Sequence, residues 1–244
     1  MRVIRIHARA PLAPGATIKL PGDATAHVRR VLRLGPGDPV TLFNGDGWDY
    51  PGTLGEPLEG LLGVTLRARV PAAAESPLAI TLVQGVSRGD RMDIVLQKAT
   101  ELGVVRIVPV FAERSVVRLD REQAERKLAH WQGIVIAACE QCGRAVVPEV
   151  TAPVKLESFL ALPSRVRVRL LLALGASQSL AAAAAGAGAV ELLIGPEGGL
   201  APAEQAAAQS AGFERVLLGP RTLRTETAAI AALAVLQSSA GDLS

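Results

Sequence analysis

The sequence predicts an α/β protein in two parts: a small β-rich N-terminal domain, and a C-terminal domain with a mainly parallel sheet that helices cover on both faces. Short apolar runs separated by glycine- and proline-containing turns occupy residues 1–70, which is typical of short strands. A proline- and alanine-rich break follows at Pro71–Pro77. Beyond it, apolar runs alternate with helical patterns, as in successive βαβ units. We therefore expect domains at residues 1–72 and 73–244.

The N-terminal domain is expected to consist mainly of strands that end at PG, GPGD and NGDG turns. The strand-like runs are Val3–Ile6, Thr17–Leu20, Val40–Phe43, Trp48–Leu54 and Leu61–Val70. The segment Asn44–Gly47 is the strongest local turn signal in the chain, because asparagine and glycine tolerate the backbone angles of a hairpin tip. It should therefore join two antiparallel strands.

One helix should interrupt these strands, from Ala24 to Leu34, with Asp23 as its N-cap and Gly35 as its stop. Its apolar side would be formed by Val28, Val31 and Leu32. Its basic side would be formed by His27, Arg29, Arg30 and Arg33. Basic side chains at this spacing are able to follow the phosphates of a nucleic acid. The alternative is an ordinary solvated helix face.

The C-terminal domain is expected to alternate strands and helices, and this order favours parallel pairing. The predicted strands are Leu78–Gln84, Val104–Phe111, Arg167–Leu174, Val190–Ile194 and Glu214–Leu218. The predicted helices are Asp90–Leu102, Glu122–Gln141, Pro202–Ala211 and Thr225–Gln237. The first of these helices should bury Met92, Val95, Leu96 and Ala99, which recur at helical spacing.

Two apolar runs near the C-terminus each stop in a glycine-proline pair. The first leads into the loop Gly195–Gly199, with the sequence GPEGG. The second leads through Gly219–Leu223 into a helix whose first turn carries Arg224, Thr225 and Glu226. If the two strands are neighbours, both loops lie at the carboxyl edge of the sheet and form a ligand crevice. The alternative is a pair of ordinary strand-to-helix turns.

Composition narrows the class of protein. The net charge of +3 does not by itself indicate a nucleic-acid partner, although arginine, with its planar guanidinium, suits phosphate. The N-terminus does not resemble a signal peptide, and no uninterrupted apolar run reaches membrane-spanning length. We expect a cytoplasmic protein with no membrane partner. Cys139 and Cys142 should be reduced and partly buried, and we expect no metal, because only His130 lies near them.

The segment GPEGG, followed by LGPRTLRTETAA, resembles the signature of the RsmE family, which are knotted methyltransferases of ribosomal RNA. The segments SRG, QKATELG, ERS, EQCGR and HVRRVLRLGPGD match the family's pattern too, so the resemblance covers most of the chain. RsmE proteins belong to the SPOUT superfamily. The resemblance therefore implies a C-terminal SPOUT trefoil-knot parallel sheet flanked by helices, with an N-terminal PUA-like β-barrel domain that binds RNA.

The resemblance also implies a function. RsmE proteins use S-adenosyl-L-methionine to methylate N3 of a specific uridine in 16S rRNA of the small ribosomal subunit. Two alternatives stay open: methylation of another RNA or position, such as a transfer RNA ribose, and a non-catalytic RNA-binding protein of ribosome assembly. SPOUT enzymes are homodimers. The helix Ala228–Leu236 is apolar nearly all round, so it should be either fully buried or an interface.

Four residues are candidates for catalysis: Arg224, Glu197, Glu226 and Arg114. The arginines would supply a positive field or grip the RNA. The glutamates would accept or orient the proton of the nucleophile, although Glu226 could equally well complement the positive end of its helix.

By the same resemblance, the cofactor contacts are Leu172, Ala173, Leu174, Gly175, Gly195, Pro196, Glu197, Gly198, Gly199, Leu217, Leu218, Gly219, Leu223, Arg224 and Thr225. The run LLALGAS stands where many members of the family have a polar His-Pro group, so it is open whether this loop still contacts the cofactor. The RNA-binding candidates are His27, Arg29, Arg30, Arg33, Arg88, Lys98, Arg114, Arg118, Arg144 and Arg221. Simpler accounts exist for some, such as an exposed stem for Lys98 and a helical ion pair of Glu140 with Arg144.

Overall fold

The computed structural model describes residues 4–117 and 119–243, and these residues form two compact units. The N-terminal unit contains the described residues up to Glu75 together with Cys139–Val147. The C-terminal unit contains Ser76–Ala138 and the described residues from Pro148 onward. The sequence reasoning had placed residues 139–147 in the second domain, because nothing local to them indicates packing with the first.

The N-terminal unit is built on a mixed sheet with the strand order β1-β3-β4-β5-β2, and β6 pairs with β4. Its strands are β1 (Ile4–His7), β2 (Thr17–Lys19), β3 (Pro39–Phe43), β4 (Trp48–Leu58), β5 (Leu61–Leu66) and β6 (Val70–Pro71). The predicted hairpin tip joins the antiparallel strands β3 and β4. The single strand predicted at Leu61–Val70 is wrong, because β5 and β6 pair with different parts of β4.

The predicted helix of this unit is shorter than expected and changes its winding. An α-helical turn, α1 (Gly22–Ala26), is followed by a π-helical turn, η1 (His27–Val31), and Pro21 rather than Asp23 is the N-cap. The helix cannot continue through Arg33, whose φ is 55°. The extra residue per π-turn rotates Val31 away from Val28. Val31 is therefore 65% exposed, and its expected place on the apolar side is wrong.

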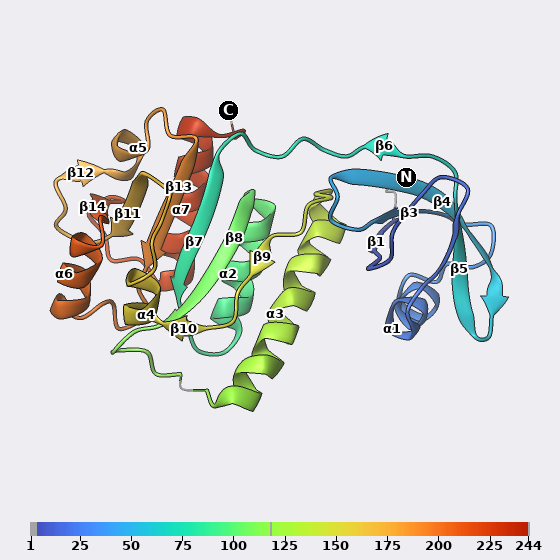
Figure 1. The fold of residues 1–244 in the computed structure, drawn as a ribbon, viewed down its shortest axis with the longest axis horizontal. Coiled ribbons are helices and arrows are strands. Elements are labelled where there is room, and N and C mark those ends of the chain that lie inside the picture. The colour runs from blue at the N-terminus through green and yellow to red at the C-terminus, as the bar shows by residue number, and fades with distance from the viewer. Residues whose placement is uncertain (1–3, 118, 244) are drawn as a thin grey trace. The chain divides into compact units, whose positions relative to one another are not determined.

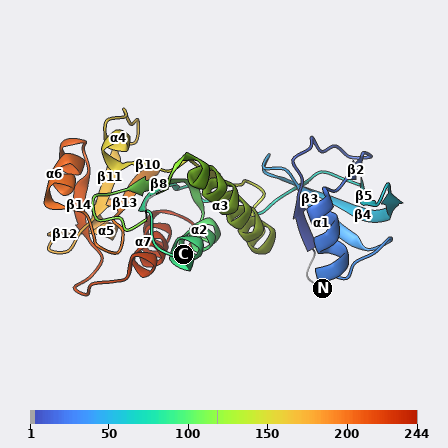
Figure 2. The ribbon, with the colours of Figure 1, turned by 90° about the horizontal axis from the view of Figure 1, so that it is seen from below.

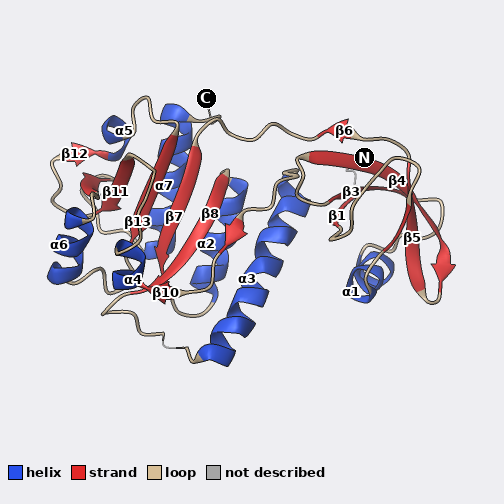
Figure 3. Ribbon diagram, in the orientation of Figure 1, coloured by secondary structure: helices blue, strands red, loops and turns tan. Residues whose placement is uncertain are grey.

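The C-terminal unit is built on a sheet with the order β10-β8-β7-β13-β11-β14-β12, with β9 beside β8, and every described pairing is parallel. The strands are β7 (Ala79–Gly85), β8 (Val104–Phe111), β9 (Glu149–Val150), β10 (Val154–Lys155), β11 (Val168–Leu172), β12 (Gln178–Ser179), β13 (Ala189–Ile194) and β14 (Glu214–Leu217). The helices are α2 (Asp90–Glu101), α3 (Arg121–Cys142), α4 (Leu156–Leu160), α5 (Leu180–Ala183), α6 (Pro202–Ser210) and α7 (Thr225–Ala240). Figure 3 shows these helices around the strands of the sheet.

Helices cover both faces of this sheet, as the sequence predicts. Helices α2 and α7 pack against each other on one face, and α4 and α6 pack on the other (Figures 1 and 2). The four apolar positions predicted for α2 are all buried. The α/β class with a parallel sheet flanked by helices is thus confirmed. The short elements β9, β10, β12, α4 and α5 were not predicted, since runs of two to five residues carry little periodicity.

The terminal helix α7 buries one face, which includes Ala229, Ala232, Leu233 and Leu236. Ile230 and Val235 on its other face are only partly buried in the single chain. The helix is therefore not buried all round. In the described part of the chain, no helix combines the length and the apolar character that crossing a bilayer requires.

Candidate functional site

A cavity of about 690 Å³ lies at the carboxyl edge of the parallel sheet. Three stretches of chain line it: the loop that follows β11, the glycine-rich loop that follows β13, and the segment between β14 and α7. The expectation that β13 and β14 are neighbours is wrong, because β11 lies between them. The two loops still meet, since parallel strands bring their carboxyl ends to the same edge. The loop after β11 completes the cavity.

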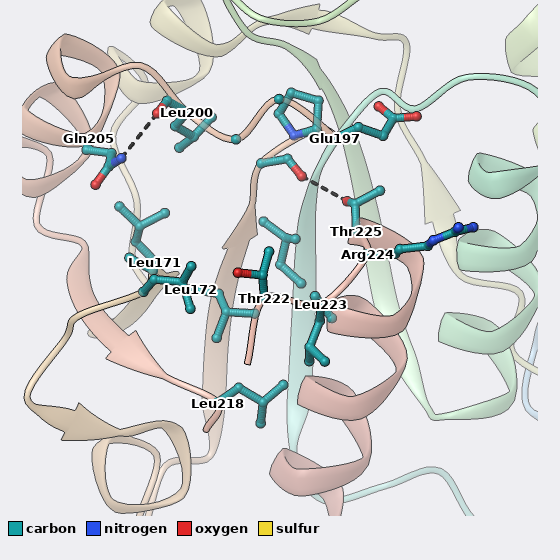
Figure 4. A pocket seen from close by; sticks show the side chains of 18 of the residues that line it. Leu171, Leu172, Glu197, Leu200, Gln205, Leu218, Thr222, Leu223, Arg224 and Thr225 are labelled. Carbon is teal, nitrogen blue, oxygen red and sulfur yellow. Dashed lines mark hydrogen bonds between the residues drawn. The ribbon is translucent and has the colours of Figure 1, made fainter. Parts of the chain in front are cut away.

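One side of the cavity is apolar. Figure 4 shows the side chains of Leu171, Leu172, Leu218 and Leu223 grouped around it. Such a surface suits a flat ring or an aliphatic chain, and a volume of this size is typical of small-molecule sites. The other lining residues are Arg91, Arg114, Ala173, Leu174, Ile194, Gly195, Pro196, Glu197, Gly198, Gly199, Leu200, Gln205, Arg215, Leu217, Gly219, Arg221, Thr222, Arg224, Thr225 and Ala228.

The glycine-rich loop packs so closely against its surroundings that two positions require glycine. A Cβ added to Gly198 would lie 2.9 Å from the Cβ of Arg114. Gly85, at the end of β7, has Pro196 against it, and a Cβ there would lie 2.3 Å from the backbone nitrogen of Pro196. Both distances are shorter than van der Waals contact, so a larger residue would displace the loop.

A chain of buried hydrogen bonds links the glycine-rich loop to the start of α7. The fully buried Gln84 donates from Nε2 to Oγ1 of Thr225, over 2.9 Å. Thr225 in turn donates from Oγ1 to the carbonyl oxygen of Gly195, over 2.8 Å (Figure 4). Because Gln84 and Thr225 are buried, this chain joins two of the stretches that line the cavity from within the fold.

Charged side chains from three elements meet at the rim. Nη1 of Arg91 lies 3.1 Å from Oε1 of Glu197, and its Nε lies 3.9 Å from Oε1 of Glu226. The backbone N–H of Arg88 also donates to Glu197, over 2.9 Å. Desolvation raises the pKa of Glu197, but hydrogen bonds from the N–H groups of Arg88 and of Glu197 itself, and then Arg91, outweigh it. The net effect is a pKa below the ordinary value of 4.5.

The second rim carboxylate is less well satisfied. Oε2 of Glu226 is buried and has no hydrogen-bond partner among the described residues. Glu226 itself does not belong to the cavity lining of the described chain, but Arg91, which does, bridges it to Glu197.

Both predicted catalytic arginines, Arg114 and Arg224, also line the cavity. Arg114 donates from Nη1 to the carbonyl oxygen of Gly198, over 3.3 Å. Arg224 is the exposed N-cap residue of α7, and Figure 4 shows its side chain directed away from Leu171 and Leu172. No ion pair or hydrogen bond of the Arg224 side chain is seen within the described residues. Its guanidinium is therefore available to a ligand.

The structure brings together most of the predicted cofactor contacts. All of them line the cavity except Gly175, which lies just beyond the part of the LLALGAS run that does. Among the RNA candidates, Arg114 and Arg221 line the cavity, and Arg88 is exposed at the start of α2. Lys98 is held in an ion pair with Glu101, over 2.9 Å, at the other end of that helix. Arg118 lies outside the described residues.

The RNA candidates of the N-terminal unit divide into exposed and buried residues. The exposed group lies on η1 and just beyond it, and consists of His27, Arg29, Arg30 and Arg33. Arg144, by contrast, is buried and forms an ion pair with Glu75. Because Arg144 is buried, its side chain is poorly placed to contact RNA directly. Its ion pair with Glu75 indicates a structural role instead. Glu140, its suggested helical partner, accepts the backbone N–H of His7 over 2.9 Å.

Sequence reasoning missed Arg91, Gln84, Gln205 and Arg215. Gln205 donates to the carbonyl oxygen of Leu200 over 3.1 Å, and Arg215 donates to that of Leu174 over 2.9 Å, so both brace cavity loops. The partners of Arg91 lie more than a hundred residues further along the chain. Gln84 carried a usable signal, because a glutamine that ends a buried apolar strand needs a partner.

The two cysteines are free thiols, and Cys139 is buried. Burial raises the pKa of Cys139 to about 12, so it is unreactive at neutral pH. His130 contacts Asp93 on α2, with Nε2 and Oδ2 2.8 Å apart. Within the described chain, no cluster of histidine, cysteine and carboxylate side chains is arranged to hold a metal ion.

Residues 74–237 match the family model of the RNA methyltransferase domain, so this part of the chain is an RNA methyltransferase domain. The likeness extends over the whole chain. This chain is 32% identical to ribosomal RNA small subunit methyltransferase E of Buchnera aphidicola (Schizaphis graminum strain), and the match covers 100% of this chain and 99% of the relative. The corresponding protein of Mycobacterium tuberculosis is 34% identical over 90% of this chain and 85% of its own. The chain belongs to the ribosomal RNA small subunit methyltransferase E family, and the RsmE resemblance is confirmed.

Two solved structures resemble this fold over 100% of both chains. One is ribosomal RNA small subunit methyltransferase E of Neisseria gonorrhoeae bound to S-adenosyl methionine, with a TM-score of 0.92 and 38% identity. The other is a methyltransferase of Legionella pneumophila in complex with the same cofactor, with a TM-score of 0.94 and 39% identity.

Proposed function

We propose that this protein transfers a methyl group from S-adenosyl-L-methionine to N3 of a specific uridine in the 16S rRNA of the small ribosomal subunit. The observation that carries the proposal is the three-sided cavity at the carboxyl edge of the sheet, in a chain of the RsmE family. The two relatives solved with this cofactor support the same assignment.

The residues present fit this cofactor. Leu172, Leu218 and Leu223 offer an apolar surface for the adenine ring, and the loop Gly195–Gly199 offers backbone groups to the polar parts. Three of the five residues of this loop are glycines, so most of its backbone carries no side chain. When bound, the cofactor would supply a methyl group on a positively charged sulfur, which is already activated for transfer.

The protein then has to hold the uridine in line, exclude water and remove the proton from N3. Orientation of this kind contributes about 7–11 kcal/mol in favourable cases. N3 lies on the Watson–Crick edge, so the base must be turned out of its stack. Our candidates for accepting this proton or orienting the base are Glu197, which lines the cavity, and Glu226, which lies beside Arg91 at the rim; Arg91 and the N–H of Arg88 already engage Glu197.

The arginines at the cavity would stabilise negative charge that develops on the uracil ring. Arg224 is exposed at the start of α7, and Arg114 is anchored to the glycine-rich loop. Positive groups aimed at developing charge are typically among the largest contributions to catalysis. The exposed basic group on η1 and just beyond it would also bind the RNA.

We also infer the finer architecture from membership of the family. The N-terminal domain, residues 1–72, would be a PUA-like β-barrel, and residues 73–244 would form a SPOUT trefoil knot. The mixed sheet of the N-terminal unit and the parallel sheet of the C-terminal unit support this division. We expect a cytoplasmic homodimer that needs no metal for the reaction.

Two measurements test the proposal. Calorimetry with S-adenosyl-L-methionine comes first, and an absence of binding would favour a non-catalytic protein of ribosome assembly. Small subunits and free 16S rRNA from a strain that lacks the modification are then incubated with protein and cofactor, and the modified base is mapped by mass spectrometry. We expect methylation at N3 of one uridine. Methylation elsewhere, or only of transfer RNA, would identify a different SPOUT activity.

A further inference from the structure

Residues 84–91 run from the end of β7 to the first turn of α2, and they lie outside the loops to which the cofactor contacts were assigned. Of this stretch, only Arg91 lines the cavity within the described chain. Nevertheless the stretch touches two of the cavity's three sides, namely the glycine-rich loop and the start of α7, at several separate points.

Gln84 and Gly85, at the interior end of this stretch, contact the cavity's sides through a buried hydrogen bond and close packing. Gln84 is fully buried and donates to Oγ1 of Thr225, which in turn donates to the carbonyl oxygen of Gly195. The same Nε2 also donates to the carbonyl oxygen of Gly85, over 3.1 Å, which limits the rotation of the amide. Gly85 then lets Pro196 approach where any side chain would collide. These contacts determine where the first residues of the glycine-rich loop lie relative to α7.

Arg88 and Arg91, at the rim end of this stretch, contact the cavity's sides through a hydrogen bond and ion pairs. The N–H of Arg88 and the guanidinium of Arg91 both engage Oε1 of Glu197, in the glycine-rich loop. The same guanidinium faces Glu226, in the first turn of α7. One cation thus lies between two carboxylates from the two sides of the cavity. Without it, the carboxylates would repel each other and favour a wider opening.

We propose that residues 84–91 act as a clasp that sets the separation between the glycine-rich loop and the start of α7, with Gln84 and Arg91 as positioning residues for cofactor binding. The proposal rests on the proposed function, because it takes S-adenosyl-L-methionine as the ligand of the cavity. A cavity whose sides are held apart at the correct distance binds without first having to close. Loss of the clasp lowers the fraction of binding-competent molecules, and the apparent affinity falls by that fraction.

The test uses the full chain with Gln84→Leu and Arg91→Met, each of which removes the polar contacts of one side chain at similar side-chain volume. Arg121→Gln is the matched control, because Arg121 also lies in the first turn of a helix and pairs with a glutamate over 3.1 Å, at an exposed position. Calorimetry gives the Kd for S-adenosyl-L-methionine, and thermal melts report folding.

We expect Gln84→Leu and Arg91→Met to raise the Kd by about tenfold, while Arg121→Gln stays within about twofold of the wild type. In methyl-transfer assays, the KM for the cofactor should rise while the KM for RNA and the kcat at saturating cofactor change little. A merely structural defect would lower the amount of active protein and leave the cofactor KM unchanged.

Folded variants that bind the cofactor as tightly as the wild type would overturn the clasp. If Gln84→Leu fails to fold, Arg91→Met at the partly exposed rim still decides the question. If the wild type itself binds no S-adenosyl-L-methionine, the proposed function fails, and the clasp as a cofactor device fails with it. A wild type that binds, with variants that bind equally well, rejects the clasp alone.

Discussion

Glu197 and Glu226 have the same side chain and lie at the same cavity rim, but their surroundings differ. Glu197 is engaged by Arg91 and by the N–H of Arg88, and its pKa is held below the ordinary value. Glu226 faces Arg91 at the longer distance of 3.9 Å and keeps a buried oxygen without a partner in the described chain. A carboxylate that is well stabilised as an anion is a weak proton acceptor, so the contacts of Glu197 suit orientation of the rim better than proton transfer.

The lowered pKa of Glu197 predicts how the stability of the fold changes with pH. Because the folded pKa lies below the value of about 4.5 for the unfolded chain, the ionised contacts stabilise the fold above that pH. This contribution is lost as the pH falls through the folded pKa. Glu197→Gln should therefore unfold at lower urea concentration than the wild type at pH 7, and the difference should shrink below about pH 4.5. Equal midpoints at pH 7 would contradict this account.

Arg224 carries the sharpest prediction for activity. Its side chain is exposed and makes no contact within the described residues that would support the fold. Arg224→Ala should therefore keep the melting temperature of the wild type, while kcat falls by about 10²–10³-fold if the guanidinium stabilises developing charge. Methyl transfer to small-subunit RNA measures this. Full activity in the variant would refute the assignment, and Arg224→Lys shows whether charge alone is sufficient.

At the scale of elements, the strands that carry the cavity loops are joined by a buried ion pair. Arg169 on β11 and Glu191 on β13 are paired in the sheet register, with Nε and Oε2 2.7 Å apart. Arg169 also stacks on Phe213, 4.2 Å from the ring centre, and Ser164 donates to the other oxygen of Glu191. The pair therefore fastens β11 in its place between β13 and β14.

Removing one partner of this pair should be costly, because the other is left buried and charged. Arg169→Met should lower the free energy of unfolding by about 3–5 kcal/mol. The double variant Arg169→Met, Glu191→Leu should recover most of that loss, since two apolar side chains replace both charges. Urea unfolding of the two single variants and the double variant measures the coupling. Additive losses would show that the pair does not fasten the strands.

Most of the long helices and strands could be predicted from the sequence, but the order of the strands in the sheet could not. Strand β8 was predicted at its observed bounds, and the buried face of α2 was predicted from Met92, Val95, Leu96 and Ala99. The failures are the π-turn that exposes Val31 and the insertion of β11 between β13 and β14. Local periodicity reports which face of an element is apolar, whereas the order of strands depends on crossovers between distant segments.

At the scale of the whole molecule, residues 139–147 complete the N-terminal unit although they form the last turn of α3 and the segment just after it. Glu140 accepts the N–H of His7, and the carbonyl oxygen of Arg144 accepts a hydrogen bond from Arg5 over 3.0 Å. Phe43 packs against Cys139 and Ala145 in a small core of its own. The first seventy-odd residues therefore lack part of their core when they stand alone.

A fragment ending at Glu75 should consequently fail to unfold as a cooperative unit. The control is the same fragment with residues 139–147 attached through a glycine-rich linker, which should recover a sigmoidal transition because it restores the missing contacts. Circular dichroism during urea titration distinguishes the two. A cooperative transition of the short fragment, at the midpoint of the linked one, would show that residues 139–147 add nothing to stability.

The partly exposed apolar face of α7, with Ile230 and Val235, supports the proposed dimer. Light scattering at micromolar concentration should give twice the chain mass of 25.3 kDa. A monomer under these conditions would count against the dimer, and would leave this helix face exposed to solvent.

The sequence by itself determined the α/β class, most of the long elements, the family, and the two glycine-bearing loops, because these follow from local periodicity, turn residues and short motifs. Only the tertiary structure decided that β11 lies between the two loop-bearing strands, that Arg91 and Gln84 join the cavity's sides, and that Arg144 is buried against Glu75. The physical reason is distance along the chain. Each of these contacts joins residues that lie far apart in sequence, so no local pattern of side chains records them.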